Sequence, residues 1–224
     1  MNTSIPSPRP THPFLPFRRV SLGTAAWAAA LGMALVLPAS YAIHYLLPLP
    51  PASALQLATK AKLLAVTPLW LLALKSLLIY PVLEECFYRG IILQLLRRYL
   101  PLWVALVPPT LLFGLTHLGR SPANAVFATL AGLAFAWLLI RSGSLVPGIL
   151  CHIAVNLFVV FLLPLAVRSL GPRVTAMDLT HPLPLVLLAV SLAVLVAATR
   201  KLRAAFPRPA PLVSPAGSGV PVAA

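Results

Sequence analysis

The sequence predicts an all-α protein, a polytopic bundle of membrane-spanning helices. Of its 224 residues, 60% are apolar and 9% are charged, whereas about 25% of the residues of a soluble domain carry a charge. The apolar residues gather into long runs, and about 20 of them suffice to cross the hydrocarbon core of a bilayer as a helix. Because prolines blur the limits of these runs, we expect roughly six to eight helices.

The chain divides into one helical domain and two terminal arms. Residues 1–19 form a proline-rich basic arm that we expect to be disordered, and residues 200–224 form a basic tail of the same kind. The domain covers residues 20–199. Its apolar runs lie at 20–47, 63–83, 101–119, 123–140, 145–167 and 182–199.

Short polar or proline-containing segments separate the runs. The segment 54–65 carries two lysines, and we expect it to lie along the membrane interface. Pro81 predicts that a helix ends or kinks there, so that a new helix covers 82–100. Pro101 then opens the next run, which two further prolines interrupt.

The net charge of +14 reflects basic residues that lie mostly between the apolar runs and in the two arms. Lysine and arginine beside membrane spans orient the spans and contact anionic lipid head groups. This pattern argues against nucleic-acid binding. We expect both termini to lie in the cytoplasm. The short loops and the composition rich in Ala, Leu and Arg favour a prokaryotic inner membrane.

The chain has only three acidic residues, Glu84, Glu85 and Asp178, and two of them stand side by side in an apolar stretch. Placing charge there is costly unless the protein uses it. Most other strongly polar residues of the apolar runs occur in three short strings. These are EECFYR at 84–89, FGLTH at 113–117 and HIAVN at 152–156.

Each string places two residues four positions apart, and therefore on one face of a helix. The pairs are Glu85 with Arg89, Phe113 with His117, and His152 with Asn156. Polar side chains at membrane depth turn inward and find partners. We therefore expect the three strings to meet, and we expect Glu85 and Arg89 to form a buried ion pair.

Counting residues supports part of this convergence. Glu84 lies sixteen residues before Leu100, and His117 lies sixteen residues after Pro101. An antiparallel hairpin at this corner returns both side chains to a similar depth, about 24 Å away at 1.5 Å per residue. For His152 the pattern predicts only that it needs a partner. Glu84 is left over from the ion pair, because a residue five positions away lies about 140° around the helix. An unpaired carboxylate near histidines indicates chemistry.

The ordered set EExxxR, FxxxH and HxxxN resembles the CPBP family of intramembrane proteases. That family includes the type II CAAX prenyl endopeptidases and the bacterial Abi proteins. The resemblance covers about residues 77–160, and no motif position departs from it. It implies hydrolysis of a peptide bond near the C-terminus of a membrane-anchored protein or peptide, either a prenylated C-terminus or a C-terminal sorting tail.

The residues suit this reaction. A carboxylate in an apolar pocket suits a general base that activates water, and we assign this role to Glu84, assisted by His117. His152 and Asn156 lie on one helix face and are assigned as donors to the oxyanion of the tetrahedral intermediate.

Four further residues are assigned to support the site. Glu85 and Arg89 hold the motif helix and fix the rotamer of Glu84. Phe113 completes the second motif. Tyr88 stands one turn after Glu84 and is expected to line the same pocket.

Two alternatives remain at this point. Glu84, His117 and His152 are also three possible zinc ligands that leave one position for water. The cofactor is therefore either none or zinc, and the lack of an HExxH string favours none. An intramembrane set of Glu, Arg and His also fits a proton-coupled transporter or a non-enzymatic immunity or sorting partner, although the sequence shows no internal inverted repeat.

Overall fold

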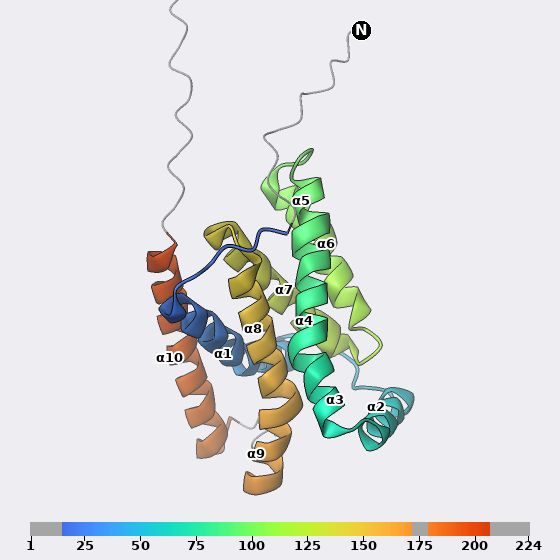
Figure 1. Cartoon of the computed structure of the whole chain (residues 1–224). Helices are drawn as coiled ribbons and strands as arrows, with labels where there is room; N and C mark the ends of the chain where they lie inside the picture. The colour runs from blue at the N-terminus through green and yellow to red at the C-terminus, as the bar shows by residue number, and fades with distance from the viewer. Residues whose placement is uncertain (1–14, 172–178, 207–224) are drawn as a thin grey trace, which may run out of the picture.

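The computed structural model describes residues 15–171 and 179–206, and all regular structure in these ranges is helical. This confirms the predicted all-α class. Figure 1 shows the helices as one bundle, with α8 between the pair α1 and α10 and the long helix that contains α4. The helical segments are α1 (Leu22–Leu46), α2 (Ala54–Val66), α3 (Leu69–Ala73), α4 (Tyr80–Glu84), α5 (Leu93–Leu96), α6 (Leu102–Thr116), α7 (Pro122–Ser142), α8 (Leu145–Leu157), α9 (Leu163–Leu170) and α10 (Pro182–Ala205), with π-helical turns η1 (Leu74–Ile79), η2 (Glu85–Ile92) and η3 (Phe158–Leu162).

Four helices in the described ranges are long and apolar enough to cross a membrane. They are Leu22–Leu46, Pro122–Ser142, Leu145–Ser169 and Pro182–Ala205. The expectation of six to eight spanning helices is therefore too high. The helix that runs from α3 to α5 carries the charged motif, and α6 has only 15 residues, fewer than the roughly 20 that a bilayer requires.

The helix from Leu69 to Leu96 continues through Pro81, so the predicted break before residue 82 is wrong. Proline lacks the N–H that an α-helix needs and clashes with the preceding turn. The π-helical turn η1 lies just before it, and there the N–H of Tyr80 bonds to the carbonyl of Lys75. This wider turn accommodates the proline without ending the helix.

The corner at Pro101 is present as predicted. α5 ends at Leu96, Pro101 is the N-cap of α6, and α6 packs back against η2 and α5. Pro108 and Pro109, however, lie inside α6 and do not interrupt it. A short turn then leads to α7, whose N-cap Ser121 accepts a hydrogen bond from the backbone N–H of Asn124.

α8 is the centre of the bundle and packs against α1, α7 and the motif helix. Gly32 of α1 lies directly against the backbone carbonyl of Cys151 on α8, and no Cβ fits between them. Ser191 of α10 adds a buried hydrogen bond to the carbonyl of Ala34, at 3.0 Å. Small residues thus bring these backbones together.

Order extends into parts of both predicted arms. The backbone N–H of Arg18 and the Ser144 hydroxyl form a hydrogen bond of 3.1 Å, and the carbonyl of Pro16 accepts one from Leu145. α10 continues to Ala205, because Leu202 is fully buried and Arg141 donates to the carbonyl of Arg203. The remaining arm residues, 1–14 and 207–224, lie outside the described residues.

The segment expected along the membrane interface forms α2, beside the bundle (Figure 1). Ser53 and Gln56 cap its first turn reciprocally. The side-chain amide of Gln56 also donates to the carbonyl of Leu118, at 3.1 Å. α2 is therefore attached to the turn between α6 and α7, next to His117.

Candidate active site

Three elements bring the three polar strings together. Glu84 is the last residue of α4 and Glu85 the first of η2, His117 is the C-cap of α6, and His152 lies in α8. α8 packs against both α4 and η2, and α6 packs against η2. The hairpin of the motif helix and α6, with α8 beside it, therefore forms the frame of the site.

Glu85 and Arg89 form the expected ion pair. Oε1 of Glu85 lies 2.9 Å from Nη1 of Arg89, and each side chain is 1% exposed. The same Oε1 lies 3.1 Å from Nδ1 of His152. Because an ionised carboxylate only accepts hydrogen bonds, Nδ1 of His152 carries a hydrogen in this contact. His152 thus has the partner that the sequence required.

Glu84 has a different environment from its neighbour. Its side chain is 31% exposed, and its Oε2 lies 3.5 Å from Nε2 of His152. Glu84 forms no ion pair with lysine or arginine in the described part of the chain, whereas Oε1 of Glu85 contacts both Arg89 and His152. The two adjacent glutamates are therefore not equivalent.

His117 is oriented by its own motif. Its Nδ1 lies 2.8 Å from the carbonyl of Phe113, which can only accept, so Nδ1 donates and Nε2 is left for the site. The Phe113 ring lies between the two histidines, with centroid distances of 4.8 Å to His117 and 5.6 Å to His152. The motif phenylalanine therefore spaces the two imidazoles.

Aromatic rings enclose the buried guanidinium of Arg89. Its Cζ lies 4.5 Å from the centroid of Phe113, 5.4 Å from that of Phe135 and 5.8 Å from that of Tyr88. Nη2 of Arg89 has no hydrogen-bond partner among the described residues, and the ring faces supply cation–π contacts instead. Tyr88, which we expect to line a pocket with Glu84, also packs edge-on against Phe113, with a centroid distance of 5.3 Å.

Asn156 connects α8 to the motif helix. Its Nδ2 donates to the backbone carbonyl of Ser76, at 2.8 Å. Ser76 lies in the π-helical turn η1, where the backbone hydrogen bonds span five residues instead of the four of an α-helix. One amide hydrogen of Asn156 is used in this way, and the second remains for the pocket that Asn156 lines.

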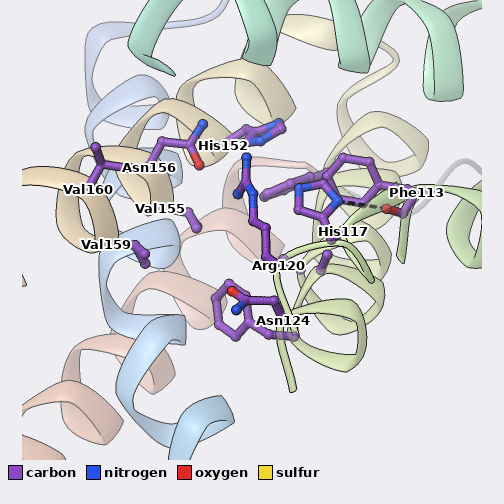
Figure 2. A pocket seen from close by; sticks show the side chains of 13 residues that line it. Phe113, His117, Arg120, Asn124, His152, Val155, Asn156, Val159 and Val160 are labelled. Carbon is purple, nitrogen blue, oxygen red and sulfur yellow. Dashed lines mark hydrogen bonds between the residues drawn. The ribbon is translucent and has the colours of Figure 1, made fainter. Parts of the chain in front are cut away.

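A pocket of about 50 Å³ opens beside the histidines. Figure 2 shows that His117, His152 and Asn156 surround it together with Arg120. A water molecule needs about 10–15 Å³ measured in this way, so the pocket has room for a few waters or a small part of a substrate. Glu84 is not among the residues that line this pocket, but its Oε2 lies 3.5 Å from Nε2 of His152, which does line it.

Several neighbours of the site were not predicted. Phe135 stacks on His152, with a centroid distance of 4.7 Å and an angle of 18°. Gly132 lies beside the Arg89 guanidinium, where a Cβ would be 2.5 Å from Nη2. Both occur in a uniformly apolar run, where no sequence signal separates them from lipid-facing residues. Arg120 was visible only as one of several basic residues between runs.

The zinc alternative depends on whether Glu84, His117 and His152 are grouped closely enough to share one metal ion. Among the described residues, no three His, Cys, Asp or Glu side chains are grouped so that they can hold a metal ion. Both nitrogens of His152 face glutamates, and Nδ1 of His117 is bonded to a carbonyl.

Comparison with known proteins agrees with the motifs. Residues 66–158 match the family described as Type II CAAX prenyl endopeptidase Rce1-like. The matched segment contains all three motifs, and it confirms the resemblance to the CPBP and CAAX protease family. No curated protein and no solved structure matches the chain.

Proposed function

We propose that this chain is an intramembrane endopeptidase in which Glu84 activates the water that cleaves a peptide bond near the C-terminus of a membrane-anchored substrate. The family match supports an intramembrane endopeptidase. The observation that carries the mechanism is the contrast between the adjacent glutamates: the side chain of Glu85 is 1% exposed and ion-paired, whereas that of Glu84 is 31% exposed and faces His152.

The general base is Glu84. A base must reach the proton that it removes, directly or through one water. Glu84 is the one carboxylate of the described site that is not already bonded to arginine, and it contacts His152, which lines the pocket. It takes a proton from water, and the resulting hydroxide attacks the carbonyl carbon of the scissile peptide bond.

His117 orients the attacking water. Its Nδ1–H donates to the carbonyl of Phe113, so its Nε2 accepts a hydrogen bond from a water in the pocket. Two acceptors, Glu84 and His117, then hold the two hydrogens of that water. This fixed orientation lowers the barrier because the nucleophile does not have to be ordered during the reaction.

Asn156 and His152 stabilise the oxyanion. The free amide hydrogen of Asn156 faces the pocket while the other bonds to Ser76. His152 donates to Glu85 through Nδ1, and in the proposed step a hydrogen on its Nε2 is donated to the oxyanion. Donors fixed in advance at the site of developing charge are among the largest contributions to catalysis.

Collapse of the tetrahedral intermediate completes the reaction. The protonated Glu84 passes its proton to the nitrogen of the leaving peptide, and the C–N bond breaks. One product ends in a new carboxylate, the other begins with a new amine, and one water is consumed. Glu84 returns to the carboxylate form that began the cycle.

The surroundings proposed for this reaction follow from the composition, the loop lengths and the charge pattern of the chain. We place the protein in a prokaryotic inner membrane, which its short loops and its composition rich in Ala, Leu and Arg favour. Both termini are placed in the cytoplasm because the two terminal arms are basic. The same residues contact anionic lipid head groups. The substrate is a membrane-anchored protein or peptide, and nucleic acid is not a partner.

Reconstitution with defined peptides tests the proposal. The purified protein is placed in phospholipid vesicles with a pool of palmitoyl-anchored peptides whose C-terminal segments are randomised, and products are identified by mass spectrometry. We expect new C-termini with the wild-type protein and none with a double variant that carries Glu84→Gln and Glu85→Gln. Equal product from both preparations would show a contaminating protease and remove the support for the site.

A further inference from the structure

We propose that Pro81 is a positioning residue for the oxyanion donor Asn156. Because proline has no backbone N–H, it leaves the carbonyl of Ser76 free to hold the side-chain amide of Asn156. This inference rests on the proposed function, in which the second amide hydrogen of Asn156 meets the oxyanion. Pro81 belongs to none of the three motifs and does not line the pocket beside the histidines, so its effect on the reaction passes through Asn156.

The backbone hydrogen bonds of η1 relate Pro81 to Ser76. In a π-helical turn each N–H bonds to the carbonyl five positions earlier, and at the end of η1 the N–H of Tyr80 bonds in this way to the carbonyl of Lys75. In the same register, an N–H at position 81 would bond to the carbonyl of Ser76. Proline has no N–H, so the Ser76 carbonyl is left without this helical partner.

The side chain of Asn156 takes the place of the missing N–H. Its Nδ2 lies 2.8 Å from the carbonyl oxygen of Ser76, where α8 packs against η1. Ser76 is 9% exposed, and a buried carbonyl without a partner is costly. Groups of neighbouring helices commonly satisfy the carbonyls that proline frees in a membrane helix. The acceptor that holds Asn156 is therefore available because residue 81 is a proline.

The same arrangement occurs a second time, away from the site. Pro38 lies inside α1, and an α-helical N–H at that position would bond to the carbonyl of Ala34, four positions earlier. The hydroxyl of Ser191, on α10, donates to this carbonyl at 3.0 Å. In both cases a polar side chain of a neighbouring helix fills the position that the missing N–H of a proline leaves open.

The bond to Ser76 sets the orientation of the Asn156 amide. The amide carries two hydrogens on one nitrogen, so bonding one of them to the Ser76 carbonyl fixes the direction of the other. Asn156 also lies one helical turn after His152, on the same face of α8, and both residues line the pocket. Donors that are fixed in advance do not have to reorient as charge develops on the oxyanion.

An N–H at position 81 would compete with Asn156. In a regular helical turn the carbonyl points along the helix axis toward its N–H partner, and proline opens the turn because its ring clashes with the preceding turn. With alanine at position 81 the turn closes, and the carbonyl of Ser76 turns toward the axis and away from α8. Asn156 then loses the partner that orients it, while the motif helix gains a hydrogen bond.

Replacement of Pro81 tests this assignment through opposite effects on activity and stability. In Pro81→Ala, kcat for the best-cleaved peptide of the randomised pool should fall about tenfold to a hundredfold, approaching the effect of losing one oxyanion donor. KM should stay near that of the wild-type protein. The melting temperature should equal or exceed the wild-type value, because alanine favours a helix interior and proline does not.

A substitution without an N–H separates the missing hydrogen bond from the proline ring. Pro81→lactate, introduced by nonsense suppression, joins Tyr80 through an ester and therefore has neither an N–H nor the ring. It should recover most of the activity that Pro81→Ala loses, because the carbonyl of Ser76 stays free. The matched control is Pro38→Ala, which removes the second proline of this kind and should keep the wild-type kcat.

Four results would overturn the proposal. Pro81→Ala would keep the wild-type kcat, or it would melt clearly below the wild-type protein, which would make Pro81 a residue of the fold alone. Pro81→lactate would be as slow as Pro81→Ala, which would assign the effect to the ring. Finally, Pro81→Ala would lower kcat by the same factor in an Asn156→Ala background, which would show that Pro81 acts through another residue such as Glu84.

Melting measurements separate this inference from the proposed hydrolysis. If the wild-type protein cleaves no peptide, the proposed function fails, and the link between the two residues is still measurable. Asn156→Ala should lower the melting temperature of the wild-type protein by a few degrees, because the buried carbonyl of Ser76 loses its partner. In the Pro81→Ala protein the same substitution should have little effect, since the new N–H bonds to that carbonyl. Equal shifts in both backgrounds would reject the assignment.

Discussion

Oε1 of Glu85 lies 3.1 Å from Nδ1 of His152, a contact between residues 67 positions apart in the chain. This contact joins the EExxxR helix to α8 and fixes which nitrogen of the imidazole carries the hydrogen toward Glu85. The same oxygen pairs with Arg89. One glutamate of the adjacent pair is therefore part of the framework of the site, and the other, Glu84, is the proposed base.

The first prediction concerns Arg89. Arg89→Ala leaves the carboxylate of Glu85 without its cation. Both side chains of this pair are buried, each being 1% exposed. Removing one partner of a buried pair costs about 3–5 kcal/mol. We expect less folded protein and a clearly lower melting temperature, measured by fluorescence in detergent.

The matched control for that variant is Arg200→Ala, because Arg200 is an exposed arginine on α10. It should melt like the wild-type protein. Normal accumulation and melting of Arg89→Ala would show that the ion pair contributes little to the stability of the fold.

The contact between α1 and α8 provides a second prediction. In Gly32→Ala, the new methyl group would overlap the backbone carbonyl of Cys151, which cannot rotate away. We expect the helices to separate and the protein to lose several kcal/mol, as overpacked cores commonly lose about 1–3 kcal/mol and backbone clashes more. Thermal melting and protease resistance in vesicles measure the effect.

Gly23→Ala is the control for this substitution. Gly23 lies in the first turn of the same helix, and a Cβ there would meet only Ser21 Oγ, at 4.0 Å. Its melting temperature should stay the same or rise slightly, because alanine favours helix over glycine. A Gly32→Ala protein that melts like Gly23→Ala would contradict close packing of these two helices.

Much of the fold was predictable because apolar length and proline position are local signals. The all-α class and the corner at Pro101 follow from them directly. Pro81 misled the prediction because a π-helical turn compensates for its missing N–H, and that turn has no clear sequence signature. The number of spans was overestimated because an apolar run of 15 residues, such as α6, still packs inside a bundle.

The site was partly predictable for the same reason. Pairs four residues apart identify a helix face, so the contact of Glu85 with Arg89 could be expected. Nothing in the sequence predicts that His152 stacks on Phe135, or that Asn156 reaches the carbonyl of Ser76, 80 positions away. Such contacts depend on the crossing of helices, which periodicity does not specify.

The dependence on metal gives a third prediction. The described residues offer no group of three metal ligands, and the proposed mechanism uses Glu84 and His117 without one. Peptide cleavage should therefore survive dialysis against EDTA and 1,10-phenanthroline. If a chelator abolishes the activity and added zinc restores it, the result would contradict the glutamate mechanism and favour the zinc alternative.

The last prediction separates the two glutamates. Glu84→Gln keeps the shape of the side chain but removes the base, so water can no longer be deprotonated. We expect kcat/KM for cleavage of the membrane-anchored peptide to fall at least about a hundredfold, the low end for a general base. Expression and melting temperature should stay near those of the wild-type protein, because Glu84 is 31% exposed and has no arginine partner in the described chain.

Glu85→Gln should behave in the opposite way. Its neutral amide no longer balances the buried charge of Arg89, and it holds His152 less firmly, so the protein should melt at a lower temperature. Measurable cleavage should remain, since the base is intact. Activities of both variants are divided by the amount of folded protein, because instability alone also lowers the rate.

A Glu85→Gln protein that is stable but inactive, together with an active Glu84→Gln protein, would reverse the two roles. Normal cleavage by both variants would exclude glutamate-activated water, and with it the proposed protease site.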